Sequence, residues 1–374
     1  MAESSGTLRR VVIAAGGTGG HFYPGLVLAK TLRERGWQVL FLTRKADPSL
    51  ETLEAEGIPY AELDLGGLSR RPSLEWLAFL AKAAGSTRLA LRVLSDFQPS
   101  VVVGMGGYLT FPAIAAAARQ GVPRAVHDSN AVLGLANRTA LLLGAKLFWG
   151  LPPMDACGGK VTGTPIRPAL WKPGDAASAR TRLGLGPSTA TLLVFGGSQG
   201  ARGVNLAVPQ AAATALTEGG ALQVAHLAGG KDAQAVRSAY VQAGVKAAVF
   251  EYLSDMETAY AAADLVLCRS GASTLAELAA LRKPALLVPY PHASADHQTH
   301  NARVFAKAGA AVLVPEEALA ERLPGLLKDL LLSSPSAELL SRMSGSYIKL
   351  GLPMPEEAAS SLASEVEALA SGGR

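Results

Sequence analysis

The chain has 374 residues, of which 49% are hydrophobic and 17% are charged. This composition excludes a disordered protein, and the length exceeds what one hydrophobic core usually supports, so we expect two domains. The formal net charge of +5 is too small for this length to indicate nucleic-acid binding. The two cysteines, Cys157 and Cys268, match neither a disulfide framework nor a zinc-ligand pattern, which fits a reducing compartment.

Neither an export signal nor a membrane-spanning helix is predicted. The apolar run at 11–15 is shorter than the apolar core of a signal peptide. The uncharged stretch 97–118 is long enough to cross a bilayer, but glycines and prolines interrupt it. We interpret this stretch as a strand, a loop and a helix.

A strand, a glycine loop and a helix are predicted at the start of the chain. An apolar, β-branched run at 8–15 ends in the glycine loop GGTGG at 16–20, and an amphipathic pattern follows at 25–35. The same order returns halfway along the chain, with a strand at 191–195, the loop GGSQG, and a helix at 202–216. The second half therefore begins a second domain.

Further apolar runs alternate with helix-length intervals in both halves. The other expected strands are 37–43, 101–103, 124–127, 145–149, 221–227, 247–251, 264–268, 285–289 and 311–314. This alternation is typical of doubly wound parallel sheets and predicts an α/β fold with two Rossmann-like domains.

The domain boundary is expected in the Gly- and Pro-rich segment 158–188. We place the N-terminal domain at 1–163 and the C-terminal domain at 164–351. A helix is also predicted at about 352–374, and it is a candidate to pack back on the N-terminal domain.

Glycine loops between a strand and a helix are candidate phosphate sites, because backbone N–H groups at a helix N-terminus favour anions. A dinucleotide fingerprint is not present: Gly17-x-Gly19 is followed by Phe22, and Gly104-x-Gly106 by Leu109, where the third glycine is required. A Walker lysine is also missing, because Gly200 is followed by Ala201 and Arg202. The alternative for each loop is a tight turn that binds nothing.

An ordered set of short strings resembles the MurG family of bacterial glycosyltransferases nearly end to end. These are GGTGGH at 16–21, GMGGY at 104–108, HDSN at 127–130, GTPIR at 163–167, GGSQGAR at 196–202, CRSGA at 268–272 with Glu277, and HQ at 297–298. The resemblance implies glycosyltransferase family 28 and the two-domain GT-B architecture with a cleft between the domains. Asp128, Ser129 and Thr164 depart from the family pattern, which leaves their roles open.

The resemblance also implies a reaction and two substrates. GlcNAc would pass from UDP-GlcNAc, held mainly by the C-terminal domain, to the 4-hydroxyl of MurNAc in a polyprenyl-linked acceptor, lipid I. The product would be lipid II for peptidoglycan synthesis, formed in one displacement that inverts the anomeric centre. Positioned substrates, loop N–H groups and arginines would supply the catalysis.

A set of residues is expected to bind UDP-GlcNAc. They are Thr18, Gly19, Gly20, Asn130, Arg167, Ser198, Leu253, Arg269, Ala272, Ser273, Thr274, Leu275, Ala276, Glu277 and Gln298. By resemblance Ser198 contacts the diphosphate, Glu277 the ribose hydroxyls, the Leu253 backbone the uracil, Arg167 the nucleoside, and Asn130 and Gln298 the sugar hydroxyls. Carboxylates and amides suit hydroxyl recognition.

Arg269 follows a predicted strand at the edge of the sheet where ligands bind, so it is a candidate to offset leaving-group charge. A structural ion pair is the competing explanation for this arginine. Neither a metal nor a cofactor is expected, because Glu62-x-Asp64 and Asp255-x-Glu257 are only loose lookalikes of a metal motif.

His21 is the leading candidate for the general base, because imidazole readily takes a hydroxyl proton near neutral pH. The alternative is that His21 only positions the acceptor diphosphate or caps the following helix. Gly106, Gly107 and Tyr108 are expected on the acceptor side by resemblance.

Segment 68–92 mixes apolar side chains with cations. Trp76, Phe79 and Leu80 would enter a membrane surface, while Arg70 and Arg71, with Lys82 and Arg88, would meet anionic headgroups. The competing interpretation is an ordinary amphipathic core helix. A polyprenyl-anchored acceptor favours peripheral attachment to the cytoplasmic face of the membrane, where cell-wall synthesis proteins are possible partners.

Several other functions remain open from the sequence. A diacylglycerol glycosyltransferase or a UDP-sugar epimerase would use the same fold, and a non-catalytic UDP-sugar-binding scaffold would keep the same nucleotide motifs. A nicotinamide oxidoreductase is disfavoured by the missing third glycine.

Overall fold

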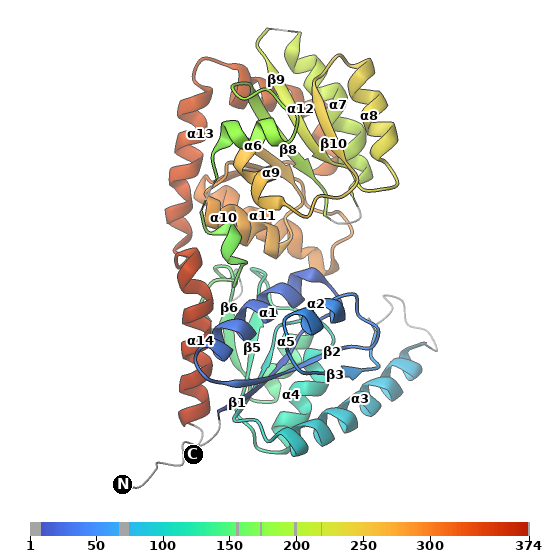
Figure 1. Ribbon diagram of the computed structural model, residues 1–374, viewed down its shortest axis with the longest axis vertical. Coiled ribbons are helices and arrows are strands. Elements are labelled where there is room, and N and C mark those ends of the chain that lie inside the picture. The colour runs from blue at the N-terminus through green and yellow to red at the C-terminus, as the bar shows by residue number, and fades with distance from the viewer. Residues whose placement is uncertain are drawn as a thin grey trace. The chain divides into compact units, whose positions relative to one another are not determined.

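The structure is a computed structural model, which describes residues 9–66, 75–154, 157–172, 174–197, 200–217 and 219–372. Internal contacts divide the chain into two compact units, one made of Met1–Arg167 with Leu352–Arg374 and the other of Pro168–Gly351. The sequence places the boundary after residue 163, and the contacts place it after Arg167. Each unit contains one parallel sheet (Figure 1).

The sheet of the first unit has the strand order β3-β2-β1-β4-β5-β6-β7, and all neighbours are parallel. Its strands are β1 (Arg10–Ala14), β2 (Gln38–Arg44), β3 (Tyr60–Leu63), β4 (Val101–Gly104), β5 (Arg124–Asp128), β6 (Lys146–Trp149) and β7 (Lys160–Val161). The predicted strands of this half are confirmed. The sequence analysis missed β3 and β7.

Both faces of this sheet are buried, which explains its continuous apolar strands. Successive residues of β1 point to opposite faces: Val11 and Ile13 belong to one core cluster, and Val12 and Ala14 to another. Helices α1 (Gly19–Glu34), α2 (Leu50–Ala55) and α14 (Pro355–Gly372) cover the first face. Helices α3 (Glu75–Phe97), α4 (Thr110–Arg119) and α5 (Leu135–Leu142) cover the second.

The C-terminal helix α14 packs on the first unit. Leu362, Ala363 and Val366 are fully buried in the core cluster around α1. At the edge of this contact, the carboxylate of Glu367 accepts hydrogen bonds from Arg35 at 2.8 Å and from the indole of Trp37 at 2.9 Å. The last helix is therefore an integral layer of the first unit.

Helix α1 begins at Gly19, so the expected start at residue 25 is wrong. The glycines and Pro24 resemble helix breakers, but Pro24 lies inside the helix and removes only one backbone donor. A Cβ added to Gly25 would lie 2.9 Å from the Cβ of Ala15. This glycine therefore allows the helix to approach the sheet closely and does not end it.

The sheet of the second unit has the order β10-β9-β8-β11-β12-β13 and is also parallel. Its strands are β8 (Ala190–Phe195), β9 (Leu222–Leu227), β10 (Ala247–Phe250), β11 (Leu265–Cys268), β12 (Ala285–Leu287) and β13 (Ala311–Leu313). All of these strands were predicted. Both sheets have the strand order of Rossmann-like folds, which confirms the predicted fold class.

The helices of the second unit alternate with its strands. They are α6 (Ala176–Arg182), α7 (Arg202–Leu216), α8 (Ala233–Gln242), α9 (Met256–Ala262), α10 (Ala272–Leu281), α11 (His297–Ala308), α12 (Leu319–Leu327) and α13 (Ser336–Gly345). Short turns of 3-10 or π type are η1 (Pro168–Leu170), η2 (Ser294–Asp296), η3 (Glu316–Ala318), η4 (Lys328–Leu332) and η5 (Ser346–Leu350). Within the described ranges, no helix is both long enough and apolar enough to cross a membrane.

Candidate functional site

The first candidate site lies where strand order reverses between β1 and β4, at the carboxyl ends of both strands. The glycine loop after β1 has Gly17 at a φ of +79°, a conformation that L side chains rarely adopt. A Cβ added to Gly17 would lie 2.6 Å from the hydroxyl oxygen of Tyr108, which follows β4. The loop after β1 and the loop after β4 are therefore packed against each other.

His21 connects these two loops from the first turn of α1. Its Nδ1 lies 3.0 Å from the carbonyl oxygen of Met105. A carbonyl only accepts hydrogen bonds, so Nδ1 carries the proton and the lone pair of the neutral ring is on Nε2. Added Cβ atoms would lie 2.9 Å from Nδ1 at Gly106 and 3.1 Å from Cδ2 at Gly107. The structure thus brings together His21, Gly106, Gly107 and Tyr108.

The sequence analysis missed Asp47, a buried carboxylate beside the first loop. It accepts hydrogen bonds from the Gly17 N–H at 2.8 Å and from the N–H and hydroxyl of Ser49 at 3.0 and 2.7 Å. Burial raises the pKa of Asp47, but the hydrogen bonds from Ser49 and Gly17 and the charge of Arg44 outweigh it, so the pKa is lowered. The sequence Asp47-Pro48-Ser49 was the local sign of this arrangement, because an Asp side chain in such a turn accepts hydrogen bonds from the residue two positions ahead.

Three other predicted residues lie at the start of α1. The carbonyl of Thr18 accepts from the N–H groups of His21 and Phe22, at 3.2 and 3.1 Å, and so begins the helix. The amides of Gly19 and Gly20 stand in the first turn, where the helix dipole favours an anion. Asp47 already accepts from the Gly17 amide, so an anion at this loop would have to compete with Asp47 for that donor.

Asp128 organises the loop after β5. Its carboxylate accepts from the backbone and side-chain N–H groups of Asn130 at 3.1 and 3.2 Å, from the Gly134 N–H at 2.8 Å, and from Asn137 at 2.9 Å. A carboxylate is an acceptor with room for several such donors. The departure from the family pattern at Asp128 therefore has a structural role, which is to hold the predicted sugar-reading residue Asn130.

The other two departures surround His127. This histidine is fully buried, with Nε2 3.0 Å from the Gly163 carbonyl oxygen and Nδ1 3.4 Å from the Ser129 hydroxyl. Burial lowers the pKa of His127, which favours the neutral ring. Thr164 is buried where a Cβ on Gly150 would meet its hydroxyl. Ser129 and Thr164 are thus part of the packing behind the β5 loop.

Arg167, expected near the nucleoside, belongs to the first unit. Its guanidinium carbon lies 5.5 Å from the ring centroid of Tyr23 on α1, a distance typical of a cation–π contact.

The second candidate site lies at the same topological position in the second unit, between the carboxyl ends of β8 and β11. Gly197 and Gly200 have φ values of +99° and +75°, and the Gly200 N–H donates to the Gly197 carbonyl at 3.0 Å. A Cβ on Gly200 would lie 2.3 Å from the Ala228 carbonyl oxygen, so only glycine fits. Ser198, the predicted diphosphate contact, lies outside the described residues.

A buried polar network holds the backbone against which this second loop packs. Asn205 donates to the same Ala228 carbonyl and to Asp232, both at 2.8 Å. Its amide oxygen lies 3.0 Å from Nε2 of His226, whose Nδ1 lies 2.9 Å from the hydroxyl of Tyr240. Burial lowers the pKa of His226 to about 3, so the imidazole is neutral. Asn205, held by the neutral ring of His226 and by the carboxylate of Asp232, therefore fixes the backbone on which Gly200 rests.

Glu277, the predicted ribose ligand, is oriented by a tyrosine that the sequence analysis missed. The Tyr260 hydroxyl donates to Oε2 of Glu277 at 2.8 Å. Tyr260 is fully buried and packs edge-to-face on Phe195 at the end of β8, with a centroid distance of 5.9 Å. The half-buried carboxylate of Glu277 is thus held at the end of the strand that leads into the second glycine loop.

The other predicted residues of α10 differ in what they expose. Ala272, Ser273 and Thr274 are half-buried in the first turn, whereas Leu275 and Ala276 are buried. Leu275 is completely enclosed, so its side chain packs in the core and any contact with a ligand would have to use its backbone. Leu253 is half-buried in the connection between β10 and α9.

Arg269 is held by protein contacts at the end of β11. It forms an ion pair with Glu316, donates to the carbonyl oxygens of Val288 and Pro289 at 3.3 and 3.0 Å, and lies 5.5 Å from the ring centroid of Tyr290. The structural ion pair considered from the sequence is therefore present. Because Glu316 offsets its charge, Arg269 supplies less positive potential to a ligand than a lone arginine would.

Gln298 follows a turn with unusual backbone geometry. Ala295 and Asp296 have φ values of 50° and 51°, which are strained for residues with a Cβ. The side-chain oxygen of Gln298 accepts from the Tyr290 N–H at 2.9 Å, and its backbone oxygen accepts from the Ser270 hydroxyl at 2.8 Å. With its oxygen engaged, the carboxamide is suited to donate to a sugar hydroxyl.

The predicted membrane helix corresponds to α3. Its buried face includes Ala83 and Leu94, whereas Leu77 and Leu80 are 66% and 60% exposed. Phe79, expected to be a membrane contact, is only partly exposed and packs against the core. Lys82 and Arg88 are exposed, and Lys82 pairs with Asp64 at 3.2 Å. Arg70, Arg71 and the side chain of Trp76 lie outside the described residues.

A search for metal-binding groups covers the same described residues. No cluster of three or more His, Cys, Asp or Glu side chains among them could hold a metal ion.

Comparisons with known proteins agree with the division into two units. The family description "Glycosyltransferase family 28 N-terminal domain" matches residues 11–145, and "Glycosyltransferase family 28 C-terminal domain" matches residues 191–351. A crystal structure of Acinetobacter baumannii MurG superimposes with a TM-score of 0.79 at 27% identity, covering 97% of this chain and 100% of that one.

Two relatives have the name UDP-N-acetylglucosamine--N-acetylmuramyl-(pentapeptide) pyrophosphoryl-undecaprenol N-acetylglucosamine transferase. The protein from Elusimicrobium minutum is 39% identical, covering 97% of this chain and 100% of its own length. The protein from Bordetella pertussis is 41% identical, covering 83% of this chain and 85% of its own length. The chain therefore belongs to the MurG family, within glycosyltransferase family 28.

Proposed function

We propose that this glycosyltransferase moves GlcNAc from UDP-GlcNAc to the 4-hydroxyl of MurNAc in lipid I and so forms lipid II. The near full-length similarity to relatives with that activity in their names supports these substrates. The structural observation that carries the proposal is His21, whose proton is fixed on Nδ1 by Met105 beside the glycine loop. A base held in this tautomer suits the transfer of a sugar to a hydroxyl group.

In the donor site, the second glycine loop binds the diphosphate and Glu277 binds the ribose hydroxyls. Tyr260 holds Glu277 in one orientation, which reduces the side-chain entropy that binding would remove. Gln298 donates from its amide nitrogen to a hydroxyl of the sugar, since its oxygen already accepts from Tyr290. Arg269, paired with Glu316, positions the loop after β11 more than it neutralises the leaving group.

The reaction is a single displacement. The acceptor oxygen attacks C1 of the α-linked sugar from the face opposite the diphosphate and forms the new C1–O bond. As the old C1–O bond breaks, its electron pair leaves with UDP, where N–H groups at the loop stabilise the charge. The acceptor proton passes to Nε2 of His21, which makes the ring a cation whose Nδ1–H remains bonded to Met105.

The acceptor's polyprenyl chain requires the enzyme to visit a membrane, and α3 is the surface we assign to this contact. Leu77 and Leu80 are exposed on it beside Lys82 and Arg88. On the same face of the sheet, α5 exposes Leu142 by 88%. Apolar side chains next to cations suit the boundary between acyl chains and anionic headgroups. The membrane surface that we assign to this contact is the cytoplasmic one.

The decisive experiment measures transfer of labelled GlcNAc from UDP-GlcNAc to lipid I with EDTA present. The wild-type protein should form lipid II in EDTA and should use lipid I in preference to diacylglycerol. His21→Asn is the matched variant, because its amide can still donate to the Met105 carbonyl but has no basic nitrogen. Turnover should fall by about 100-fold or more, with little change in UDP-GlcNAc binding. A His21→Asn variant with wild-type turnover would remove His21 from the chemistry.

A further inference from the structure

A pocket in the second unit lies away from the donor site described above. Its volume is about 570 Å³, within the size range of small-molecule sites. It lies at the beginnings of β8, β11 and β12, next to α13, and we call it the strand-start pocket. The second glycine loop follows the other end of β8, and the six residues of this strand separate the two edges by about 20 Å.

One wall of the strand-start pocket carries more cationic than anionic side chains. Nη2 of Arg180 donates to both carboxylate oxygens of Asp264, at 2.8 and 2.7 Å, and the other guanidinium nitrogens donate to the carbonyl oxygens of Ala262 and Pro187. Its charge and its donors are therefore largely satisfied. Among the described residues that line the pocket, Asp264 is the single carboxylate, whereas Lys283 and Arg282 add two further cations. The pocket is thus positively charged overall.

Lys283 has hydrogen-bond donors that its contacts with the described residues do not use. Its ammonium donates to the Ala263 carbonyl at 2.7 Å, and the described part of the chain offers it no other hydrogen-bond acceptor. An ammonium has three donors. Burial lowers the pKa of Lys283 even though Asp264 raises it, which is the expected behaviour of a partly dehydrated cation. An anion in the pocket would replace the water that this group has lost.

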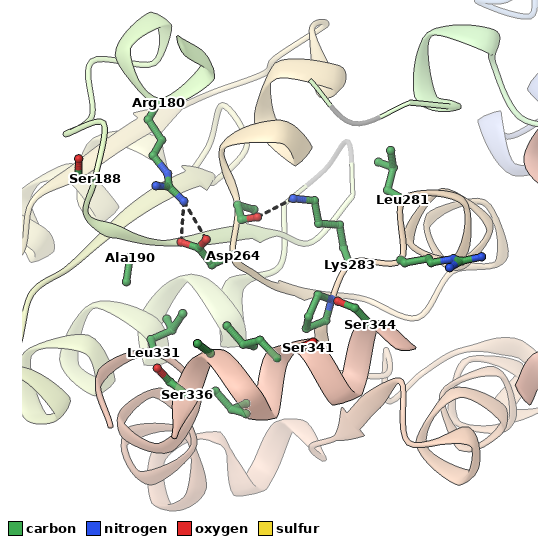
Figure 2. A pocket seen from close by; sticks show the side chains of 16 residues that line it. Arg180, Ser188, Ala190, Asp264, Leu281, Lys283, Leu331, Ser336, Ser341 and Ser344 are labelled. Atoms are coloured by element: carbon green, nitrogen blue, oxygen red, sulfur yellow. Dashed lines mark hydrogen bonds and ion pairs between the residues drawn. The ribbon is translucent and has the colours of Figure 1, made fainter. Parts of the chain in front are cut away.

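The opposite wall combines hydroxyl groups with apolar side chains. Figure 2 shows Ser336, Ser341 and Ser344, with Leu331, across the pocket from Asp264 and Lys283. Serine hydroxyls donate to anionic oxygens, and the leucine contributes apolar contact area. The two walls together match a molecule with a compact charged head and an apolar body.

We propose that the strand-start pocket binds a small amphipathic organic anion, whose phosphate or carboxylate head contacts Lys283 and the serines of α13. This site is separate from the donor and acceptor sites, and its occupant is not a substrate of the transfer reaction. Binding would add charge-assisted hydrogen bonds at a cation that is otherwise incompletely paired.

The test measures binding of hexyl phosphate to the whole protein by titration calorimetry, with saturating UDP present to occupy the donor site. Inorganic phosphate and hexanol each supply half of the proposed ligand, and hexanoate distinguishes a carboxylate head from a phosphate head. Two variants address the pocket: Lys283→Met removes the charge but keeps the chain length, and Ser341→Trp fills the space from an exposed position on α13. Lys307→Met, at an exposed lysine of α11 outside the pocket, is the control.

The expected result is saturable binding of hexyl phosphate or hexanoate that is tighter than binding of either half-ligand. Lys283→Met should weaken it by about tenfold, the usual effect of losing one hydrogen bond to a charged group. Ser341→Trp should abolish it, and Lys307→Met should leave it unchanged. Binding that UDP removes, or that a folded Ser341→Trp variant retains at wild-type strength, would show that the pocket does not bind such anions.

Discussion

Replacing Tyr260 by Phe tests whether an oriented Glu277 matters for the nucleotide sugar. The substitution removes one hydroxyl and keeps a ring that is fully buried and packed against Phe195. The lost hydrogen bond, 2.8 Å long, joins the hydroxyl to a carboxylate, and such bonds contribute about 1.5–3 kcal/mol. Because Glu277 is half-buried and water can replace part of this contact, the lower value applies, which corresponds to a change of about tenfold in affinity.

The assay is steady-state kinetics with varied UDP-GlcNAc, together with binding of UDP by calorimetry. The KM for UDP-GlcNAc should rise by about tenfold while kcat changes little, because the ribose contact is the same in the ground state and the transition state. Tyr347→Phe is the matched control: Tyr347 is another buried tyrosine of the same unit, and its hydroxyl donates to the Lys283 carbonyl. Equal KM values for Tyr260→Phe and Tyr347→Phe would refute the proposed role.

Three further predictions concern other parts of the chain. Gly107→Ala places a Cβ 3.1 Å from the His21 ring at a φ of +73°, so the free energy of unfolding should fall by about 1–2 kcal/mol in denaturant titrations. Turnover should also fall more than in the control Gly36→Ala, where the added Cβ has no atom within 4 Å. Leu80→Glu should weaken flotation with anionic vesicles by about tenfold, whereas Val241→Glu, 79% exposed on α8, should not. His226 stays neutral when folded and protonates when unfolded, so its contribution to stability is lost as pH falls from 6.5 towards 3. His226→Gln should reduce the pH slope of the unfolding free energy there by up to about 1.4 kcal/mol per pH unit, and an unchanged slope would contradict the buried neutral ring.

The strands could be predicted because burial on both faces leaves a strong local pattern. Val101 to Val103 is uniformly apolar and β-branched, and it lies at the centre of the first sheet. Strand β3 (Tyr60–Leu63) is an edge strand in which only Leu63 is buried, so its sequence is mixed. Strand β7 has only two residues, which is too short for any periodicity to be visible.

Only those residues of the candidate site that stand in a recognisable local sequence pattern could be predicted. The glycine loops and His21 stand directly after apolar strands, and parallel strands place such loops at one edge. Tyr260 contacts Glu277 from a different helix, and its position on α9 resembles that of any buried aromatic residue. Asp47 reaches Gly17 from the end of another strand. Contacts of this kind depend on the tertiary fold, and no local spacing records them.

The two glycine loops occupy equivalent positions, but the groups that contact them directly are different. At the first loop, the carboxylate of Asp47, whose lowered pKa keeps it ionised at neutral pH, accepts directly from the Gly17 amide. At the second loop, the neutral amide of Asn205 and the neutral ring of His226 fix the Ala228 carbonyl on which Gly200 rests. A diphosphate at the first loop would compete with Asp47 for the Gly17 amide. Among the described residues, no carboxylate accepts directly from a glycine amide of the second loop, and Asp232 contacts the side chain of Asn205 instead. This difference supports the proposal that the nucleotide diphosphate binds at the second loop and that His21 beside the first loop takes the acceptor proton.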